Sequence, residues 1–200
     1  MAEQLEEPPL LQLDNAFWHF SLKVYATPGV AAECLALQRA LSIDVNVLLF
    51  CAWLGAIKYI ALDADAMASI NDVVDSWHNT AVRPLRAVRE NIKALPEMAH
   101  KHVIALREEL VNSELRAEQI EQAILFGWAE ALSAKESDHA PLDLMRGNIK
   151  DFLKRHSVDS GPTCLSYSSL LQAALHVACL TEDDAASEPV SGGRSQNRER

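Results

Sequence analysis

Glycine, proline and aromatic residues are all scarce in this sequence, and their scarcity narrows the range of possible folds. The 200 residues include 7 Gly and 8 Pro, and aromatic residues make up 6%. β-Branched residues nowhere alternate with polar ones over the length of a strand, so we expect essentially no β-sheet. No uninterrupted apolar run reaches the roughly 20 residues that a transmembrane helix requires. A helix-rich globular protein without a membrane span is therefore predicted.

Positive charge is also limited: 18 Lys and Arg against 28 Asp and Glu give a net charge of −10. Nucleic-acid binding needs a basic surface, so we expect no nucleic-acid partner. The four cysteines form no C-x-x-C pair and lie in apolar helical stretches, so we interpret them as packed free thiols. The acidic opening, MAEQLEEPPL, is unlike a secretory signal. Together these features predict a cytoplasmic protein.

The most apolar stretch of the chain is DVNVLLFCAWLGAIKYIAL, residues 44–62. After Asp44 only Asn46 and Lys58 are clearly polar, and no polar face repeats at helical spacing. Asp44 is suited to cap a helix, and Lys58 would lie in the last turn, where a cation complements the helix dipole. We predict a buried central helix over 44–62, within an all-α single-domain bundle of about seven or eight helices.

Helical periodicity and helix-breaking residues divide the rest of the chain. Further helices are predicted at 16–25, 30–41, 66–78, 80–95, 96–110, 113–132 and 142–156. In domain terms, we expect a flexible lead over 1–13 and a helical domain over 14–156. A linker and an accessory C-terminal helix would occupy 157–180, and a disordered tail 181–200.

The segment FWHFSLKVYATPGVAAECLALQ, followed by DVNVLLFCAW, resembles a proteobacterial family of small, uncharacterised helical proteins. The shared pattern is F-W-x-F-S-L-x-x-Y-x-x-P-G-V, then C-L-x-L-Q, then D-V-N-x-L-L-F-C-x-W. It is specific over 15–55 and weaker through about 155. The resemblance implies an all-helical fold and a bacterial source. It brings no established activity and no catalytic residues that could be transferred to this chain.

Several polar side chains lie within the apolar N-terminal third of the chain. Buried polar groups need hydrogen-bond partners, so Asp44 and Asn46 are interpreted first as caps of the central helix. The alternative is a small-molecule pocket. Its candidate ligand-binding residues are Trp18, Tyr25, Gln38, Asn46 and Trp53.

A basic stripe is the most distinct surface feature that the sequence predicts. It consists of Arg83, Arg86, Arg89 and Lys93. The opposite side of the same helix, which includes Val88, is predicted to face the core. The stripe is first interpreted as a solvated face with helical partners such as Glu90. The alternatives are a docking surface for an acidic protein partner or a phosphate-bearing ligand and, last, a nucleic-acid contact. As a solvated face it would contribute little to stability.

One pair of residues has the spacing of a metal-ligand motif. Glu97 and His100 form an E-x-x-H pair of the kind found in di-iron bundles, and Glu136 and His139 form a second pair ahead of Pro141. The di-iron pattern needs two helical copies and two further inward glutamates, which the sequence does not provide. We therefore predict no metal, no cofactor and no catalytic residue.

Two functional hypotheses remain. The leading one is a non-enzymatic interaction or adaptor protein of the bacterial cytoplasm that uses a helical surface such as the basic stripe. The alternative is a small-molecule-binding protein or enzyme with its pocket in the N-terminal motif. An exposed apolar or basic groove with no cavity favours the first hypothesis, and a closed pocket that holds Trp18, Tyr25, Asn46 and Trp53 favours the second.

Overall fold

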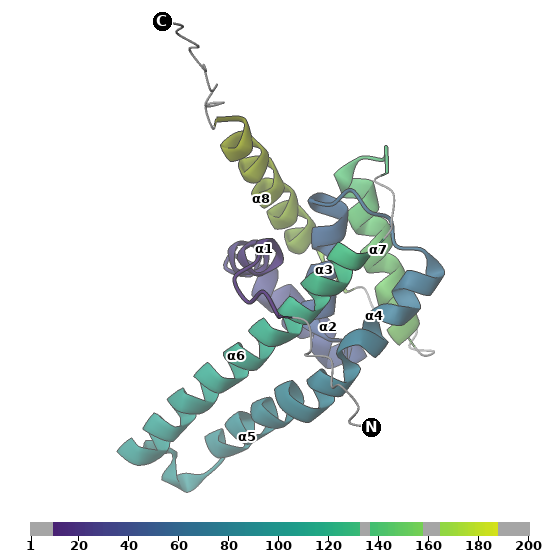
Figure 1. Cartoon of the computed structure of the whole chain (residues 1–200). Helices are drawn as coiled ribbons and strands as arrows, with labels where there is room; N and C mark the ends of the chain where they lie inside the picture. Colours follow the sequence, from purple (N-terminus) through teal and green to yellow (C-terminus); the bar gives the residue numbers. More distant parts are fainter. Residues whose placement is uncertain (1–9, 133–136, 158–164, 188–200) are drawn as a thin grey trace, which may run out of the picture.

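The computed structural model describes residues 10–132, 137–157 and 165–187, with side-chain surroundings described through 181. Within these residues the chain is helical and contains no strand, which confirms the all-α prediction (Figure 1). None of the helices in this part of the chain is both long and apolar enough to cross a membrane. The elements are α1 (Ala16–Tyr25), α2 (Val30–Leu41), α3 (Val45–Ala56), α4 (Ala64–Trp77), a π-helical turn (His78–Val82), α5 (Arg83–Lys93), a 3₁₀ turn (Pro96–Ala99), α6 (Lys101–Ala131), α7 (Pro141–His156) and α8 (Ser168–Ser187).

Helix α3 is the predicted central helix, and every residue from Asn46 to Ala56 is buried. Asp44 caps it, because a side-chain oxygen of Asp44 accepts a hydrogen bond from the Asn46 N–H at 2.8 Å. The predicted extent of 44–62 was too long, since the helix ends at Ala56 and Tyr59 adopts a left-handed φ of 54°. Beyond the helix end the Ile60 N–H bonds back to the Leu54 carbonyl at 2.9 Å. Asn148 of α7 holds the segment that follows: its amide donates to the Ile60 carbonyl at 2.9 Å and accepts from the Leu62 N–H at 2.9 Å.

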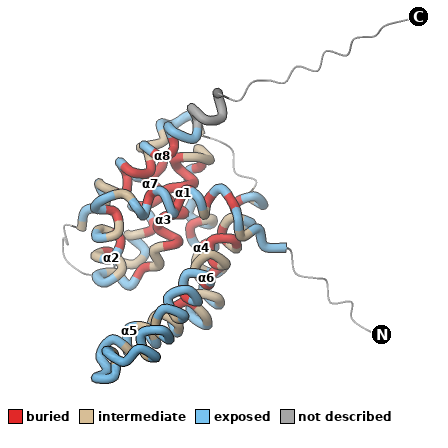
Figure 2. The backbone as a smooth tube through the Cα atoms, turned by 90° about the vertical axis from the view of Figure 1, so that its left-hand side faces the viewer, coloured by how far each residue is buried: buried red, intermediate tan, exposed pale blue. Residues whose placement is uncertain are grey.

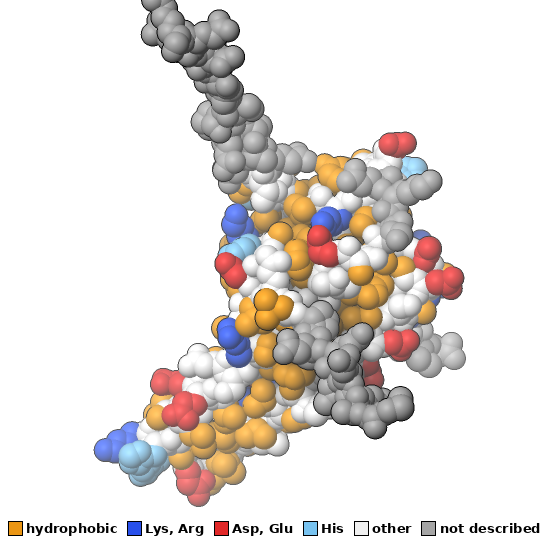
Figure 3. Space-filling model, viewed as in Figure 1, with side chains coloured by type: hydrophobic (Ala, Val, Ile, Leu, Met, Phe, Trp, Pro, Cys, Tyr) orange, Lys and Arg blue, Asp and Glu red, His pale blue; other side chains and the backbone are white. Residues whose placement is uncertain are grey.

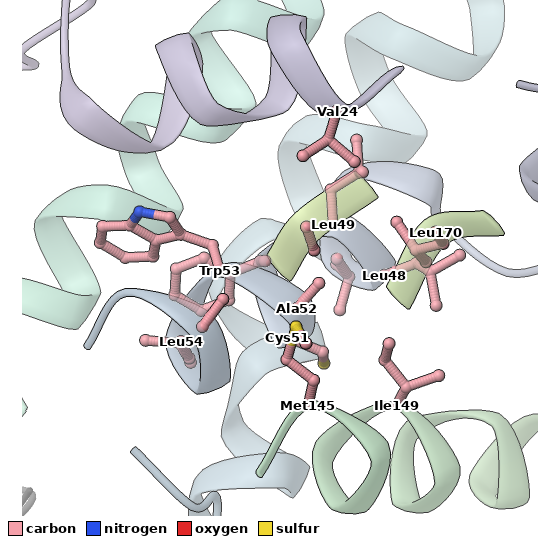
Figure 4. Packing of buried hydrophobic residues seen from close by; sticks show 14 of the residues in the cluster. Val24, Leu48, Leu49, Cys51, Ala52, Trp53, Leu54, Met145, Ile149 and Leu170 are labelled. Carbon is pink, nitrogen blue, oxygen red and sulfur yellow. The ribbon is translucent and has the colours of Figure 1, made fainter. Parts of the chain in front are cut away.

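The core surrounds α3 with α1, α2, α6, α7 and α8 (Figure 1). Figure 4 shows Met145 and Ile149 of α7 and Leu170 of α8 directed at α3. On another side, Phe17 of α1 packs against Phe50 and Trp53, with ring centroids 5.2 and 5.3 Å apart. α3 is therefore enclosed on all sides, as its lack of a polar face requires.

Helix α8 belongs to this core. Leu170 and Ala174 are fully buried, and the start of the helix is held by Glu33 of α2, whose carboxylate accepts from the Leu170 N–H at 3.1 Å. The helix begins at Ser168 and continues through Ser187, beyond the predicted start of a disordered tail at 181. The rest of that tail, 188–200, and most of the predicted lead lie outside the described residues.

Helices α5 and α6 form a hairpin that projects from the body of the protein (Figures 1 and 2). α6 is one continuous helix, so the predicted boundary at 113 was wrong: the Ser113 hydroxyl donates back to the Glu109 carbonyl at 2.9 Å instead of capping a new helix. The predicted break near Thr80 is the π-helical turn, through which α4 runs on into α5.

Gly55 provides a test of the close contact between α3 and α7. A Cβ atom at Gly55 would lie 2.6 Å from the Met145 backbone nitrogen and 2.9 Å from the Leu144 carbonyl carbon. We expect Gly55→Ala to lower the free energy of unfolding by about 1–3 kcal/mol in urea denaturation, because backbone has to move. Gly127→Ala is the control, since a Cβ there meets no atom within 4 Å. It should stabilise by roughly 0.5–1 kcal/mol through helix propensity. Equal stabilities for the two variants would contradict this packing.

Candidate functional site

A buried polar network lies where the start of α3 meets the π-helical turn and the middle of α6. Nδ1 of His78 lies 2.9 Å from Oε1 of Glu121 and 3.0 Å from Oδ2 of Asp44. The Asn46 amide donates to Oε2 of Glu121 at 2.5 Å and accepts from the amide of Gln122 at 2.7 Å. Glu121 is completely buried and Gln122 is 3% exposed. Polar groups are buried here at a cost that only their mutual hydrogen bonds offset.

The π-helical turn positions His78 in this network. Pro84 has no N–H to donate to the carbonyl of Thr80, as an α-helix would require, and the Arg83 N–H instead bonds the carbonyl of His78. The wider turn carries the chain from α4 into α5 without ending the helix. Turns of this kind are frequent at functional sites.

Several ionisable groups in and beside the network have displaced pKa values. Burial acts to lower the pKa of His78, but its contacts with Asp44 and Glu121 outweigh burial and raise that pKa to about 10. Burial raises the pKa of Glu121, against the opposing effect of His78. Burial also raises the pKa of Glu118, which is partly offset by Arg86. Such a concentration of displaced groups marks a candidate functional site.

Two depressions flank the network, and Gln38, Asp44 and Arg86 line both of them. The smaller one is a polar cavity of about 370 Å³, whose lining includes His78 and His156. The larger is a groove of about 700 Å³ between α1, α2, α5 and α6. We refer to them below as the polar cavity and the groove.

The groove contains four of the five predicted ligand-binding residues, namely Trp18, Tyr25, Gln38 and Asn46. Trp53 is not among its lining residues. Its ring is 1% exposed and packs within the core against Phe17 and Phe50. The polar floor comes from Asn46 and Gln122, so the cap interpretation of Asn46 is incomplete: this side chain also connects α3 to α6.

The basic stripe is oriented differently from the prediction. Arg86 pairs with Glu114 and Glu118 of α6, Arg89 pairs with Glu114, and the two guanidinium side chains are only 25% and 17% exposed. Val88, predicted to face the core, is 48% exposed. The predicted orientation of α5 was wrong. No residue of α5 is buried, so ion pairs with α6, rather than apolar contacts, determine which face of α5 is turned toward its neighbour.

The remaining stripe residues lie outside this interface. Lys93 is about half exposed and pairs with Glu90, and Arg83 donates to the side-chain oxygen of Asn79 at 2.9 Å. Arg86, Arg89 and Lys93 all line the groove. The predicted ligand-binding and partner-binding sets therefore meet at one surface.

Sequence reasoning missed His78, Glu121, Gln122 and Glu114. The available signal was on α6, where Glu114, Ala117, Glu121 and Leu125 recur at steps of three and four on one buried face. Nothing in the sequence links His78 to Glu121, because their contact depends on how α4 and α6 pack.

The predicted E-x-x-H pairs do not form a ligand set in the described residues. Glu97 lies in the 3₁₀ turn, His100 caps α6, and both are exposed. Glu136 lies outside the described residues. The donor set that could hold a metal is instead Asp44, His78 and Glu121, whose ligand atoms all lie within 4.8 Å of one another.

Comparison with known proteins places this geometry in a family context. Residues 16–125, more than half of the chain, match a family described as a protein of unknown function (DUF2390). The match covers α1 to α5 and most of α6, including every member of the polar network. No curated protein and no solved structure matches the chain.

Removing the Asn46 amide tests the network. Asn46→Leu leaves an oxygen of Glu121 and the amide of Gln122 without their hydrogen-bond partner. We expect the free energy of unfolding to fall by about 2–4 kcal/mol in chemical denaturation. Asn112→Leu, on the exposed surface of α6, is the matched control and should stay within about 0.5 kcal/mol of the wild type. Comparable losses in both variants would argue against the network.

Charge reversal tests the orientation of α5. The double substitution Arg86→Glu with Arg89→Glu would surround the nearly buried Glu114 with like charge, and we expect it to lower the free energy of unfolding by about 2–4 kcal/mol. The control, Arg83→Glu with Lys93→Glu, should cost less than about 1 kcal/mol because both residues are exposed. Thermal and urea denaturation measure both. A stable Arg86/Arg89 variant would restore the solvated-stripe interpretation.

Proposed function

The chain belongs to the DUF2390 family, whose function is unknown, and we propose that it is a non-enzymatic interaction protein whose groove binds an amphipathic helix of a partner protein. The partner segment would place an apolar face on the groove and an acidic residue at its rim. This form of recognition is common among proteins that bind helical peptides.

The exposed apolar side chains of the groove carry this proposal. Leu22 and Tyr25 of α1, Leu35 of α2 and Leu115 of α6 all line it, and they are 46%, 37%, 42% and 46% exposed. A gathering of large apolar side chains on an otherwise charged surface is characteristic of interaction sites. The apolar surface continues along the hairpin, where Figure 3 shows hydrophobic side chains over its exposed face.

The charges around the groove favour a partner with few but well-placed acidic groups. Arg86 and Arg89 are already paired with glutamates, and Lys93 is paired with Glu90. Arg39, which also lines the groove, has no ion-pair or hydrogen-bond partner among the described residues. Arg39 is therefore the cation available to a carboxylate of the partner. The apolar side chains supply the larger share of the binding energy.

One observation favours a second candidate, a small amphipathic molecule bound in the groove. Oε1 of Gln122 is buried, lacks a hydrogen-bond partner within the described chain, and belongs to a residue that lines the groove. The volume of about 700 Å³ also falls within the range of small-molecule sites. A ligand with a hydrogen-bond donor would satisfy this oxygen.

We place this function in the bacterial cytoplasm. Cys34 and Cys51 are free and buried, and burial raises the pKa of the Cys34 thiol to about 12 and that of Cys51 still further. Inert thiols of this kind support a structural role in a reducing compartment and argue against nucleophilic catalysis.

Site-specific photocrosslinking tests the docking proposal. The full-length protein, with a photoreactive benzoylphenylalanine at Leu35 or at Leu115, would be expressed and irradiated in its native cells. We expect the same partner protein to be captured from both positions, and mass spectrometry of the adduct would locate the crosslink in an amphipathic helix. The same substitution at Leu180 of α8, a residue of similar exposure, is the control and should not capture it.

Affinity measurements with the captured helix then separate the outcomes. Leu115→Asp should weaken binding at least about tenfold, whereas Leu180→Asp should leave it unchanged. Equal adducts at all three positions, or none at Leu35 and Leu115, would overturn the docking proposal. Native mass spectrometry of the purified protein checks the second candidate, which requires a bound small molecule that Leu115→Asp releases.

A further inference from the structure

We propose that Asp44, His78 and Glu121 form a binding site for one divalent transition-metal ion. The three residues come from the N-terminus of α3, the π-helical turn and the middle of α6, so the ion would join three separate parts of the fold. This inference does not depend on the proposed function of the groove.

The spacing of the donor atoms suits a small metal ion. Nδ1 of His78 lies 2.9 Å from Oε1 of Glu121 and 3.0 Å from Oδ2 of Asp44. Ligands about 2.1 Å from a common ion are about 3.0 Å apart at the right angles of octahedral coordination and about 3.4 Å apart at tetrahedral angles, so an ion fits after movements of at most a few tenths of an ångström. The single Nδ1–H is directed at Glu121, and Oδ2 of Asp44 is buried with no hydrogen-bond partner in the described chain.

Asn46 holds both carboxylates in a metal-binding orientation. Its backbone N–H donates to Oδ1 of Asp44 at 2.8 Å, and its side-chain amide donates to Oε2 of Glu121 at 2.5 Å. Each carboxylate thus uses one oxygen for support and presents the other to His78. The Gln122 amide fixes Asn46 in turn, at 2.7 Å. Hydrogen bonds of this kind orient ligands in known metal sites.

The charges around the site also favour a dication. Four carboxylates gather here, those of Asp44, Glu114, Glu118 and Glu121. Glu114 pairs with Arg86 and Arg89, Glu118 pairs with Arg86, and Asp44 and Glu121 share His78. The guanidinium groups balance Glu114 and Glu118. A dication balances both Asp44 and Glu121, which a single imidazolium charge does not.

The polar cavity gives the ion access and space for further ligands. Asp44 and His78 line this cavity of about 370 Å³, which is large enough to hold water molecules that complete the coordination. His156 lines the same cavity, and its Nε2 is buried without a hydrogen-bond partner in the described residues. One imidazole with two carboxylates, and no thiolate, suits Zn²⁺ or Mn²⁺.

Metal binding by the full chain tests this proposal. The purified protein would be stripped with a chelator and titrated separately with Zn²⁺ and Mn²⁺ by calorimetry, with metal content measured after dialysis. We expect one ion per chain and a higher melting temperature when it is bound. Asp44→Asn is the informative variant, because Asn caps a helix as well as Asp does and so preserves the fold. It should weaken binding on the order of 100-fold.

Two further measurements distinguish this site from adventitious binding. His100→Gln with His102→Gln removes an exposed histidine pair, whose rings are 5.3 Å apart, and should leave the affinity unchanged. X-ray absorption of the loaded protein should detect a single imidazole. Failure to bind either ion, equal affinity in Asp44→Asn, or loss of binding in the histidine-pair variant would overturn the proposal. Glu121→Gln, checked for helicity by circular dichroism, gives a second test of the ligand set.

Discussion

A helix that is apolar on every side has to be enclosed by the rest of the protein, and α3 imposes that constraint on this fold. Burial of apolar surface stabilises the fold by about 25 cal/mol per Å², and this free energy favours packing α1, α2, α6, α7 and α8 against α3. Gly55 permits the closest approach, since the backbone of α7 occupies the space of a side chain there. The outer half of the α5–α6 hairpin projects away from α3 (Figure 1). This outer half has no core to pack against and is largely exposed (Figure 2). Exposed apolar side chains such as Leu95, Ile104 and Leu106 lie on it.

Enclosing α3 also buries the polar residues at its start, and the candidate site consists of the groups that bind to them. Asp44 and Asn46 begin the helix, so they are carried into the interior with it. Asn46 is 7% exposed, and its hydrogen-bond partners, Glu121 and Gln122, must then be buried as well. Glu121 in turn requires a cation, which His78 supplies in the protein without a ligand. The need to satisfy the polar residues that begin α3 thus determines side chains in α3, in α6 and in the π-helical turn.

Local signals made the first half of the fold predictable. The bounds of α1 and α2 are those predicted, because Asn15, Pro28 and Gly29 mark helix ends through local geometry and hydrogen bonds. The segment after α3 is held instead by Asn148, which is distant in the sequence, so its departure from the helix could not be predicted. The same distinction holds for the site. The groove-lining residues Trp18, Tyr25, Gln38 and Asn46 stand out in the sequence by their polar or amphipathic character within an apolar region, whereas His78 and Glu121 come together only when α4 and α6 pack.

The hairpin reverses the usual distribution of polarity, and that reversal links the groove to the polar network. Arginines and glutamates lie between α5 and α6, where an ordinary hairpin places leucines. Replacing such ion pairs with apolar residues often stabilises a protein, so stability alone does not explain them. These ion pairs hold Arg86 in place between the groove and the polar cavity. Arg86 and Asp44 both line the two depressions and so form part of the wall between them. An occupant of the groove and an ion at Asp44 would therefore contact the same wall. Each would change the electrostatic surroundings of the other, and such coupling is reciprocal by thermodynamic necessity.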